Sequence, residues 1–188
     1  MNPSGAKPTA LRTERLTLRA LSAEDLRAAH RVFDDPLVRR RLFDDRPISV
    51  ETAKSLLGAS ERDFAAGGGG LFGPRVAGEV DLVGFCGFLW VEGVGEPEMA
   101  YGLAPAHWGR GFATEAALAV ARYAFEKAGS RRALVATEKA NVASLRVIQR
   151  LGARPLGRIS PGHPEVYYFE LAQRDGTERP ASARKGQA

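Results

Sequence analysis

AHWGRGFATEAALAVARYAFE, residues 106–126, joins two glycines to a run of small and apolar residues that is typical of a helix. Glycine loses more backbone freedom on folding than any other residue, so Gly109 and Gly111 indicate a sharp bend or a close approach to the backbone. The helix is predicted to run from about Phe112 to Ala128 and to end at Gly129. Its small side chains would let it lie close to a sheet.

The segments on either side of this stretch predict an alternation of strands and helices. Strands are predicted at residues 14–21, 71–76, 81–91, 96–103, 132–137 and 165–171. Further helices are predicted at residues 22–33, 49–64 and 141–152, and residues 34–45 form either a loop or a short helix. The order βααβββαβαβ, without an internal repeat, predicts a mixed α/β (α+β) single domain with a mostly antiparallel sheet flanked by helices.

Length and composition fit one domain with extended ends. The chain has 188 residues, of which 44% are hydrophobic, so it can bury a substantial core. We expect the domain to span residues 13–172, with a flexible N-terminus at 1–12 and a disordered tail at 173–188. No run of about 18 apolar residues exists, which argues against a membrane span.

Charge and cysteine usage exclude several classes of protein. The net charge is +5, but the two terminal segments carry four of these charges and no basic tract alternates with aromatic residues, so nucleic-acid binding is not expected. The single cysteine, Cys86, can form neither an internal disulfide nor a cysteine-based metal site. His30, His107 and His163 lack the spacing of metal ligands. The first residues lack the apolar core of a signal peptide, so we expect a cytoplasmic protein.

A glycine-rich turn before a helix is a natural site for a phosphate group. The first N–H groups of a helix have no partner within it, and the helix dipole reinforces their attraction for anions. Gly109 and Gly111 would keep side chains away from such an anion. The alternative is a tight turn that needs positive φ. A P-loop would need the sequence GK followed by Ser or Thr, and a dinucleotide site would need a βαβ unit; neither fits.

Several motifs together resemble one enzyme family. PEMAYGLAPAHWGRGFATEAALAVARYAFE at 97–126, ALVATEKANVASLRVIQRLGA at 133–153 and LVGFCGF at 82–88 resemble the GNAT superfamily of N-acetyltransferases. The sequence TERLTLRAL at 13–21 is similar to the first strand of the branch that includes the ribosomal-protein N-terminal-alanine acetyltransferases. The resemblance covers about residues 13–172. It departs from the family at Trp108, where the pyrophosphate motif usually begins with Gln or Arg.

The resemblance implies acetyl-coenzyme A (acetyl-CoA) as the acetyl donor and cosubstrate. Strands 96–103 and 132–137 would splay apart, so that free strand-edge groups pair with the pantetheine arm while the backbone amides of 110–114 hold the pyrophosphate. The residues that it implies for coenzyme binding are Leu103, Ala104, Trp108, Gly109, Arg110, Gly111, Phe112, Ala113, Thr114 and Asn141.

Acetyl transfer to an amine needs a base, because an alkylamine is protonated at neutral pH. Glu98, on the strand beside the expected thioester, is the first candidate, with a solvated glutamate as the alternative; Glu96 and Glu92 are weaker candidates. Ser144 resembles the serine that this branch places near the coenzyme sulfur, although it could be an ordinary helix-start serine. Asn141 could likewise serve only as an N-cap.

Two neighbouring residues have less specific interpretations. Tyr101 is either a core aromatic residue or a wall of the acceptor channel, and Cys86 is expected to be a small core residue.

We therefore expect an N-acetyltransferase that moves the acetyl group directly to a primary amine, either a protein N-terminus or a small amine such as a polyamine or an antibiotic. Asp34, Asp35, Asp44 and Asp45 would attract a cationic acceptor, although three arginines lie between them. The alternative is a non-catalytic CoA-binding sensor or interaction domain. The sequence leaves a homodimer open.

Overall fold

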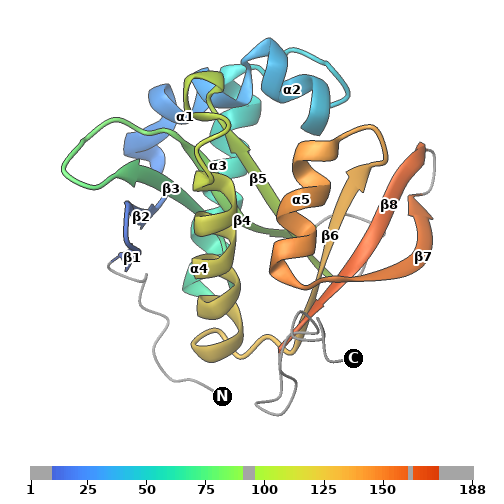
Figure 1. The fold of residues 1–188 in the computed structure, drawn as a ribbon. Helices are drawn as coiled ribbons and strands as arrows, with labels where there is room; N and C mark the ends of the chain where they lie inside the picture. Colours follow the sequence, from blue (N-terminus) through green and yellow to red (C-terminus); the bar gives the residue numbers. More distant parts are fainter. Residues whose placement is uncertain (1–9, 91–95, 161–162, 174–188) are drawn as a thin grey trace, which may run out of the picture.

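The computed structural model describes residues 10–90, 96–160 and 163–173 (Figure 1). Of the predicted terminal segments, residues 1–9 and 174–188 lie outside this part, as do Glu92 and Val91. An eight-stranded sheet forms the centre of the described domain, in the order β1-β2-β3-β4-β5-β6-β8-β7. The strands are β1 (Leu11–Arg12), β2 (Leu16–Ala20), β3 (Leu71–Val76), β4 (Gly84–Trp90), β5 (Pro97–Leu103), β6 (Arg132–Glu138), β7 (Arg154–Ser160) and β8 (His163–Ala172).

Helices cover both faces of this sheet. They are α1 (Leu26–Phe33), α2 (Pro36–Leu42), α3 (Val50–Ala65), α4 (Phe112–Glu126) and α5 (Val142–Leu151), with short 3₁₀ turns at η1 (Ala23–Asp25) and η2 (Pro105–His107). The helices α4 and α5 lie side by side over one face (Figure 1). They share a core with Met99 and Leu103 of β5, whereas α1 and α3 share a second core with Phe85 of β4. The predicted mixed α/β single domain is confirmed.

All strand pairs are antiparallel except β5 with β6, which are parallel. These two strands pair only at Glu98 with Leu134 and at Met99 with Val135. Beyond these pairs β5 continues to Leu103 beside β4, and β6 continues to Glu138 beside β8, but the two strands no longer pair with each other, so they splay apart as predicted. We call the space between these two diverging ends the strand gap.

Local sequence signals explain where several helices begin. Ser22 and Asp25 form a capping box at η1, and the Ser49 hydroxyl accepts a hydrogen bond from the Thr52 N–H (3.0 Å) at the start of α3. Asn141 caps α5, and Gly152 ends it in the left-handed conformation. The predicted bounds of these helices agree with the structure to within about two residues.

The structure adds three elements to the predicted order. Residues 36–42, predicted as a loop or short helix, form α2, with Pro36 in its first turn and Asp35 as its cap. Leu11 and Arg12, inside the predicted N-terminal segment, form β1 by pairing with Leu18 and Thr17. The strand β7 was not predicted, because its sequence RPLGRIS does not alternate and its pairing with β8 is irregular. In the described part of the chain, no helix is long and apolar enough to cross a membrane.

Candidate active site

The loop before α4, residues 108–111, presents a run of free backbone N–H groups. Gly109 and Gly111 have φ of 73° and 80°, and Gly111 is the N-cap of α4. Within the described residues, no backbone acceptor is present for the N–H groups of residues 109–114, whereas Glu115 N–H begins the helical pattern by bonding to Gly111 O (3.1 Å). The structure therefore shows the tight turn, and this turn is compatible with anion binding because it exposes these N–H groups.

The space around this loop is open. A Cβ added at Gly109 would meet no atom within 4 Å, and one at Gly111 would meet only the Arg15 guanidinium, at 3.4 Å. Gly109, Arg110 and Gly111 are exposed, whereas Phe112 is buried beneath them. Free N–H groups at the N-terminus of a fifteen-residue helix, beside two glycines that carry no side chain, fit a pyrophosphate.

An ion-pair network holds this loop to the start of the chain. The Glu115 carboxylate accepts hydrogen bonds from the Thr13 hydroxyl (2.6 Å), the Arg15 N–H (2.9 Å) and Arg15 Nε (2.8 Å). Arg15 Nη1 donates to the Arg110 carbonyl (2.9 Å). Partial burial raises the pKa of Glu115, but the hydrogen bonds from Thr13 and Arg15 outweigh it and leave the pKa below its usual value.

Backbone groups of β5 face the strand gap. The Ala104 N–H donates to Val83 O (2.9 Å), so it points toward β4, and the alternation of a strand directs the N–H groups of Leu103 and Tyr101 toward β6. The Leu103 carbonyl accepts a hydrogen bond from the Trp108 indole (2.7 Å). Of the two strand-end residues singled out in the sequence, Leu103 is thus the one whose N–H faces the gap. Trp108 connects the strand to the glycine loop.

Tyr101, Ser144 and Asn141 lie together on the α5 side of the gap. The Tyr101 and Ser144 hydroxyls are 2.7 Å apart, and the Asn141 side chain accepts a hydrogen bond from the Ser144 N–H (3.2 Å). Burial raises the pKa of Tyr101 to about 12, despite the opposing hydrogen bond with Ser144, so the phenol stays protonated at neutral pH. The sequence did not reveal this pair, because 43 residues separate the two partners. The alternation along β5 indicated only that the side chains of Tyr101 and Glu98 lie on opposite faces of the sheet.

Glu98 lies on the other face of the sheet, at the closed end of the gap. It is placed between Leu89 of β4 and Leu134 of β6 by the strand register. Burial raises the pKa of its carboxyl group, which suits a base that must also hold a proton. Glu96, two residues earlier, is instead paired with Arg132 (2.9 Å). The structure therefore brings Ser144 to Tyr101 and not to Glu98.

The acidic residues near α2 are partly engaged by arginines. Asp34 accepts hydrogen bonds from the Ile48 N–H (2.9 Å) and from Arg39 (3.2 Å), and these contacts, the first above all, hold its pKa below the usual value. Arg41 of α2 pairs with Glu138 at the end of β6 (2.8 Å). This ion pair reaches β6 from the side on which Glu98 lies, so its two charges border that side of the gap.

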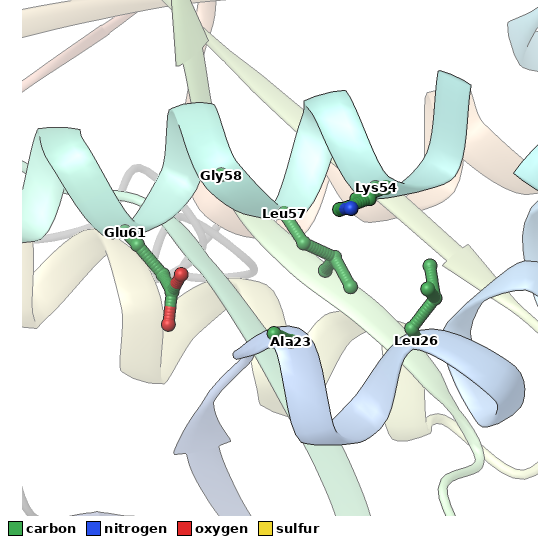
Figure 2. Close-up of a pocket in the computed structure, with 6 residues that line it drawn as sticks. All are labelled: Ala23, Leu26, Lys54, Leu57, Gly58 and Glu61. Carbon is green, nitrogen blue, oxygen red and sulfur yellow. The ribbon is translucent and has the colours of Figure 1, made fainter. Parts of the chain in front are cut away.

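A small pocket of ≈ 130 Å³ lies apart from these residues, between α3 and the η1–α1 segment (Figure 2). Its lining comes from Ala23, Leu26, Lys54, Leu57, Gly58 and Glu61. Since neither β5 nor the glycine loop contributes to it, it is not part of the candidate site. Cys86 is fully buried in the core, as expected, and burial raises the pKa of its thiol.

Comparisons with known proteins identify the family of this chain. Residues 15–154 match the model of the acetyltransferase (GNAT) domain. The uncharacterized N-acetyltransferase p20 of Bacillus licheniformis is 27% identical over 172 residues, which cover 88% of this chain and 97% of that protein.

Two solved structures have the same fold. An acetyltransferase from Agrobacterium tumefaciens has a TM-score of 0.78 at 25% identity, covering 92% of this chain and 99% of that one. A spermidine N-acetyltransferase from Vibrio cholerae, solved with CoA and spermine, has a TM-score of 0.70 at 20% identity, covering 86% and 97%. With three quarters of its residues within the domain model, the chain belongs to the GNAT acetyltransferase family.

Proposed function

We propose that this protein is an acetyl-CoA-dependent N-acetyltransferase that transfers the acetyl group directly to a primary amine. The observation that carries the proposal is the run of free N–H groups at 109–114 beside the strand gap. The first feature suits the pyrophosphate of CoA, and the second suits its extended pantetheine arm, whose amides can pair with a free strand edge. Membership of the GNAT family supports the same donor.

Different residues of the site bind different parts of acetyl-CoA. The amides of Arg110 to Thr114 bind the pyrophosphate, with Gly109 and Gly111 leaving room for it. The Leu103 and Tyr101 backbone groups pair with the pantetheine arm, and Asn141 contacts it from α5. An N–H of β5 at the gap is in position to stabilise the negative charge that develops on the thioester oxygen.

Glu98 and the Tyr101–Ser144 pair act from opposite faces of the sheet. Glu98 takes one proton from the ammonium form of the acceptor, and the neutral amine attacks the thioester carbon. The C–S bond then breaks, and the nitrogen loses its second proton as the thiolate gains one. Because a phenol with a pKa of about 12 is a weaker acid than a thiol, the pair stabilises the thiolate by hydrogen bonding while the proton comes from the amine. No acyl-cysteine is required.

The acceptor is proposed as a class. The motif TERLTLRAL at 13–21 favours the branch of ribosomal-protein N-terminal-alanine acetyltransferases, and hence a peptide N-terminus. A small amine such as a polyamine is the other acceptor class, favoured by the Glu98 carboxylate, since Glu138 on the same side of the gap is already neutralised by Arg41. A non-catalytic CoA-binding domain is the alternative function. Cytoplasmic location and a homodimer remain predictions.

Thermal melting and an acceptor screen test the proposal. CoA at a hundred times its Kd stabilises the folded state by about 2.7 kcal/mol, which for a protein of this size raises Tm by roughly 5–10 °C. ATP and NAD at equal concentration should not do so. Thiol release from acetyl-CoA with N-terminal peptides, polyamines and aminoglycosides then identifies the acceptor. A shift with NAD and none with CoA contradicts the proposal, and CoA binding without release in any arm favours the sensor function.

A further inference from the structure

Arg15 is the only residue among those described that contacts both the glycine loop and a carboxylate within the first turns of α4. Its guanidinium donates to the Arg110 carbonyl through Nη1, and to the Glu115 carboxylate through Nε (2.8 Å) and Nη2 (2.6 Å). The same group lies 5.0 Å above the Phe112 ring and 3.4 Å from the position of a Gly111 Cβ. The planar guanidinium is thus packed against the loop while all three nitrogens are engaged.

Arg15 also offsets the negative charge of Glu115 near the proposed pyrophosphate site. Glu115 lies in the first turns of α4, close to the amides that would hold a dianionic pyrophosphate. Its carboxylate is stabilised by the helix dipole and by Thr13, but it would repel a second anion at the same helix end. Its lowered pKa keeps it ionised at neutral pH. The Arg15 guanidinium neutralises that charge through Oε2, whereas the Thr13 hydroxyl bonds to Oε1.

The backbone contact has a separate effect. An exposed loop with two glycines can populate many conformations, and binding a ligand would have to order it. The hydrogen bond to the Arg110 carbonyl fixes the peptide between Arg110 and Gly111, whose N–H is one of the free donors. With this contact, the Gly111 N–H is held in place beside the first turn of α4 before a ligand binds.

We propose that Arg15 is a positioning residue for the coenzyme: it fixes the glycine loop through the Arg110 carbonyl and cancels the charge of Glu115 beside the pyrophosphate. This inference rests on the proposed function, because it assigns a role toward the pyrophosphate of CoA. It adds a residue 95 positions away from the loop in the sequence.

Two single variants separate this role from a purely structural one. Arg15→Gln removes the cation and the carbonyl contact together, so we expect CoA affinity to fall on the order of tenfold. Glu115→Gln keeps an acceptor for Arg15 but removes the negative charge, so CoA should bind as tightly as to the wild type or more tightly. If the network only stabilised the fold, both variants would lower Tm and weaken CoA alike.

Isothermal titration of each folded variant with CoA measures these effects, with melting curves recorded in parallel. Arg15→Gln combined with Glu115→Gln should recover part of the lost affinity, and Arg15→Lys, which keeps the charge but not the fork, should fall between wild type and Arg15→Gln. Arg75→Gln is the matched control. Arg75 also joins a carboxylate (Asp25, 2.6 Å) to a backbone carbonyl (Gly73, 3.0 Å), but away from the loop, so its loss should lower Tm only.

The outcomes are distinct. Wild-type affinity in Arg15→Gln, or a loss in Glu115→Gln equal to that in Arg15→Gln, overturns the inference. If Arg15→Gln does not fold, Arg15→Lys and Glu115→Gln decide it by the same comparison. Failure of the wild type itself to bind CoA would instead count against the proposed function.

Discussion

Gly109 and Gly67 adopt the same left-handed backbone and have the same empty space where a side chain would begin. Their φ values are 73° and 79°, and an added Cβ would meet no atom within 4 Å at either position. They differ in place, since Gly67 follows α3 and Gly109 belongs to the proposed pyrophosphate loop. The pair therefore allows the backbone cost of a side chain to be separated from its effect on a ligand.

We expect Gly109→Ala and Gly67→Ala to destabilise the fold equally, by roughly 1 kcal/mol, because a Cβ is strained in the left-handed region. Only Gly109→Ala should weaken CoA, since its methyl group enters the space over the free N–H groups. Urea denaturation and CoA titration of both variants measure the two effects. Equal CoA affinity in both variants would separate Gly109 from the coenzyme site.

Glu98 makes a second residue-scale prediction, in which stability and activity change in opposite directions. Burial raises its pKa, so above that pKa the folded state carries the cost of a desolvated charge, and this cost disappears as the pH falls below the ordinary value for glutamate. Glu98→Gln should therefore raise Tm at pH 7–8, with the difference vanishing in acid. As the loss of a general base, it should also lower kcat by roughly 10²–10⁴ and remove the low-pH limb of the rate profile.

Glu96→Gln provides the control for this variant. It removes a carboxylate two residues away that is paired with Arg132 (2.9 Å), so it should leave the pH profile unchanged. Near-wild-type turnover of Glu98→Gln across pH 6–9, once an acceptor is known, would reject Glu98 as the base.

At the scale of elements, the Asn141 side chain both caps the start of α5 and makes a proposed contact with the ligand. Asn141→Ala should cost about 1 kcal/mol through the lost cap, as should Ser49→Ala at the start of α3, which lies on the other face of the sheet. Asn141→Asp should restore Tm, because aspartate caps equally well, without restoring CoA affinity, because it cannot donate to the pantetheine arm. Melting curves and CoA titration check this; full recovery of affinity in Asn141→Asp would reduce Asn141 to a cap.

Elements with a local signal were predictable from the sequence, and those without one were not. The cap and stop residues Asn141 and Gly152 define α5 within the chain itself, and the glycine loop is equally local. By contrast, β1 has two residues and β7 lacks alternation, so only their pairing with β2 and β8 makes them strands.

The contacts of the site show the same division. The Arg15–Arg110 and Tyr101–Ser144 contacts join residues that are 95 and 43 positions apart in the sequence. In both pairs, the sequence around one residue gives no indication of its partner. Sequence reasoning could place Glu98 and Ser144 on neighbouring elements, but not on opposite faces of the sheet. The register of β5 with β4 and β6 supplies that information.

At the scale of the whole molecule, the C-terminal strand ends in contact with the rest of the domain. Pairing of β8 with β6 continues to Ala172 opposite Arg132, and the Gln173 N–H donates to the Arg131 carbonyl (3.1 Å). Removing residues 174–188 should therefore leave Tm within about 2 °C and CoA affinity unchanged, although it removes two net positive charges. Loss of a cooperative melt, or of CoA binding, would assign a structural or binding role to this segment.

The gap between β5 and β6 also affects how two central backbone amides exchange with solvent. Two residue pairs hold the sheet together at this point, so the Tyr101 and Leu103 amides lie in the middle of eight strands without a strand partner. An amide N–H without a hydrogen-bond partner does not need the sheet to unfold, locally or globally, before it exchanges with solvent. These two central positions should therefore exchange like surface amides in the free protein and slow only when an extended ligand bridges the halves, which makes them a direct readout of donor binding at single-residue resolution.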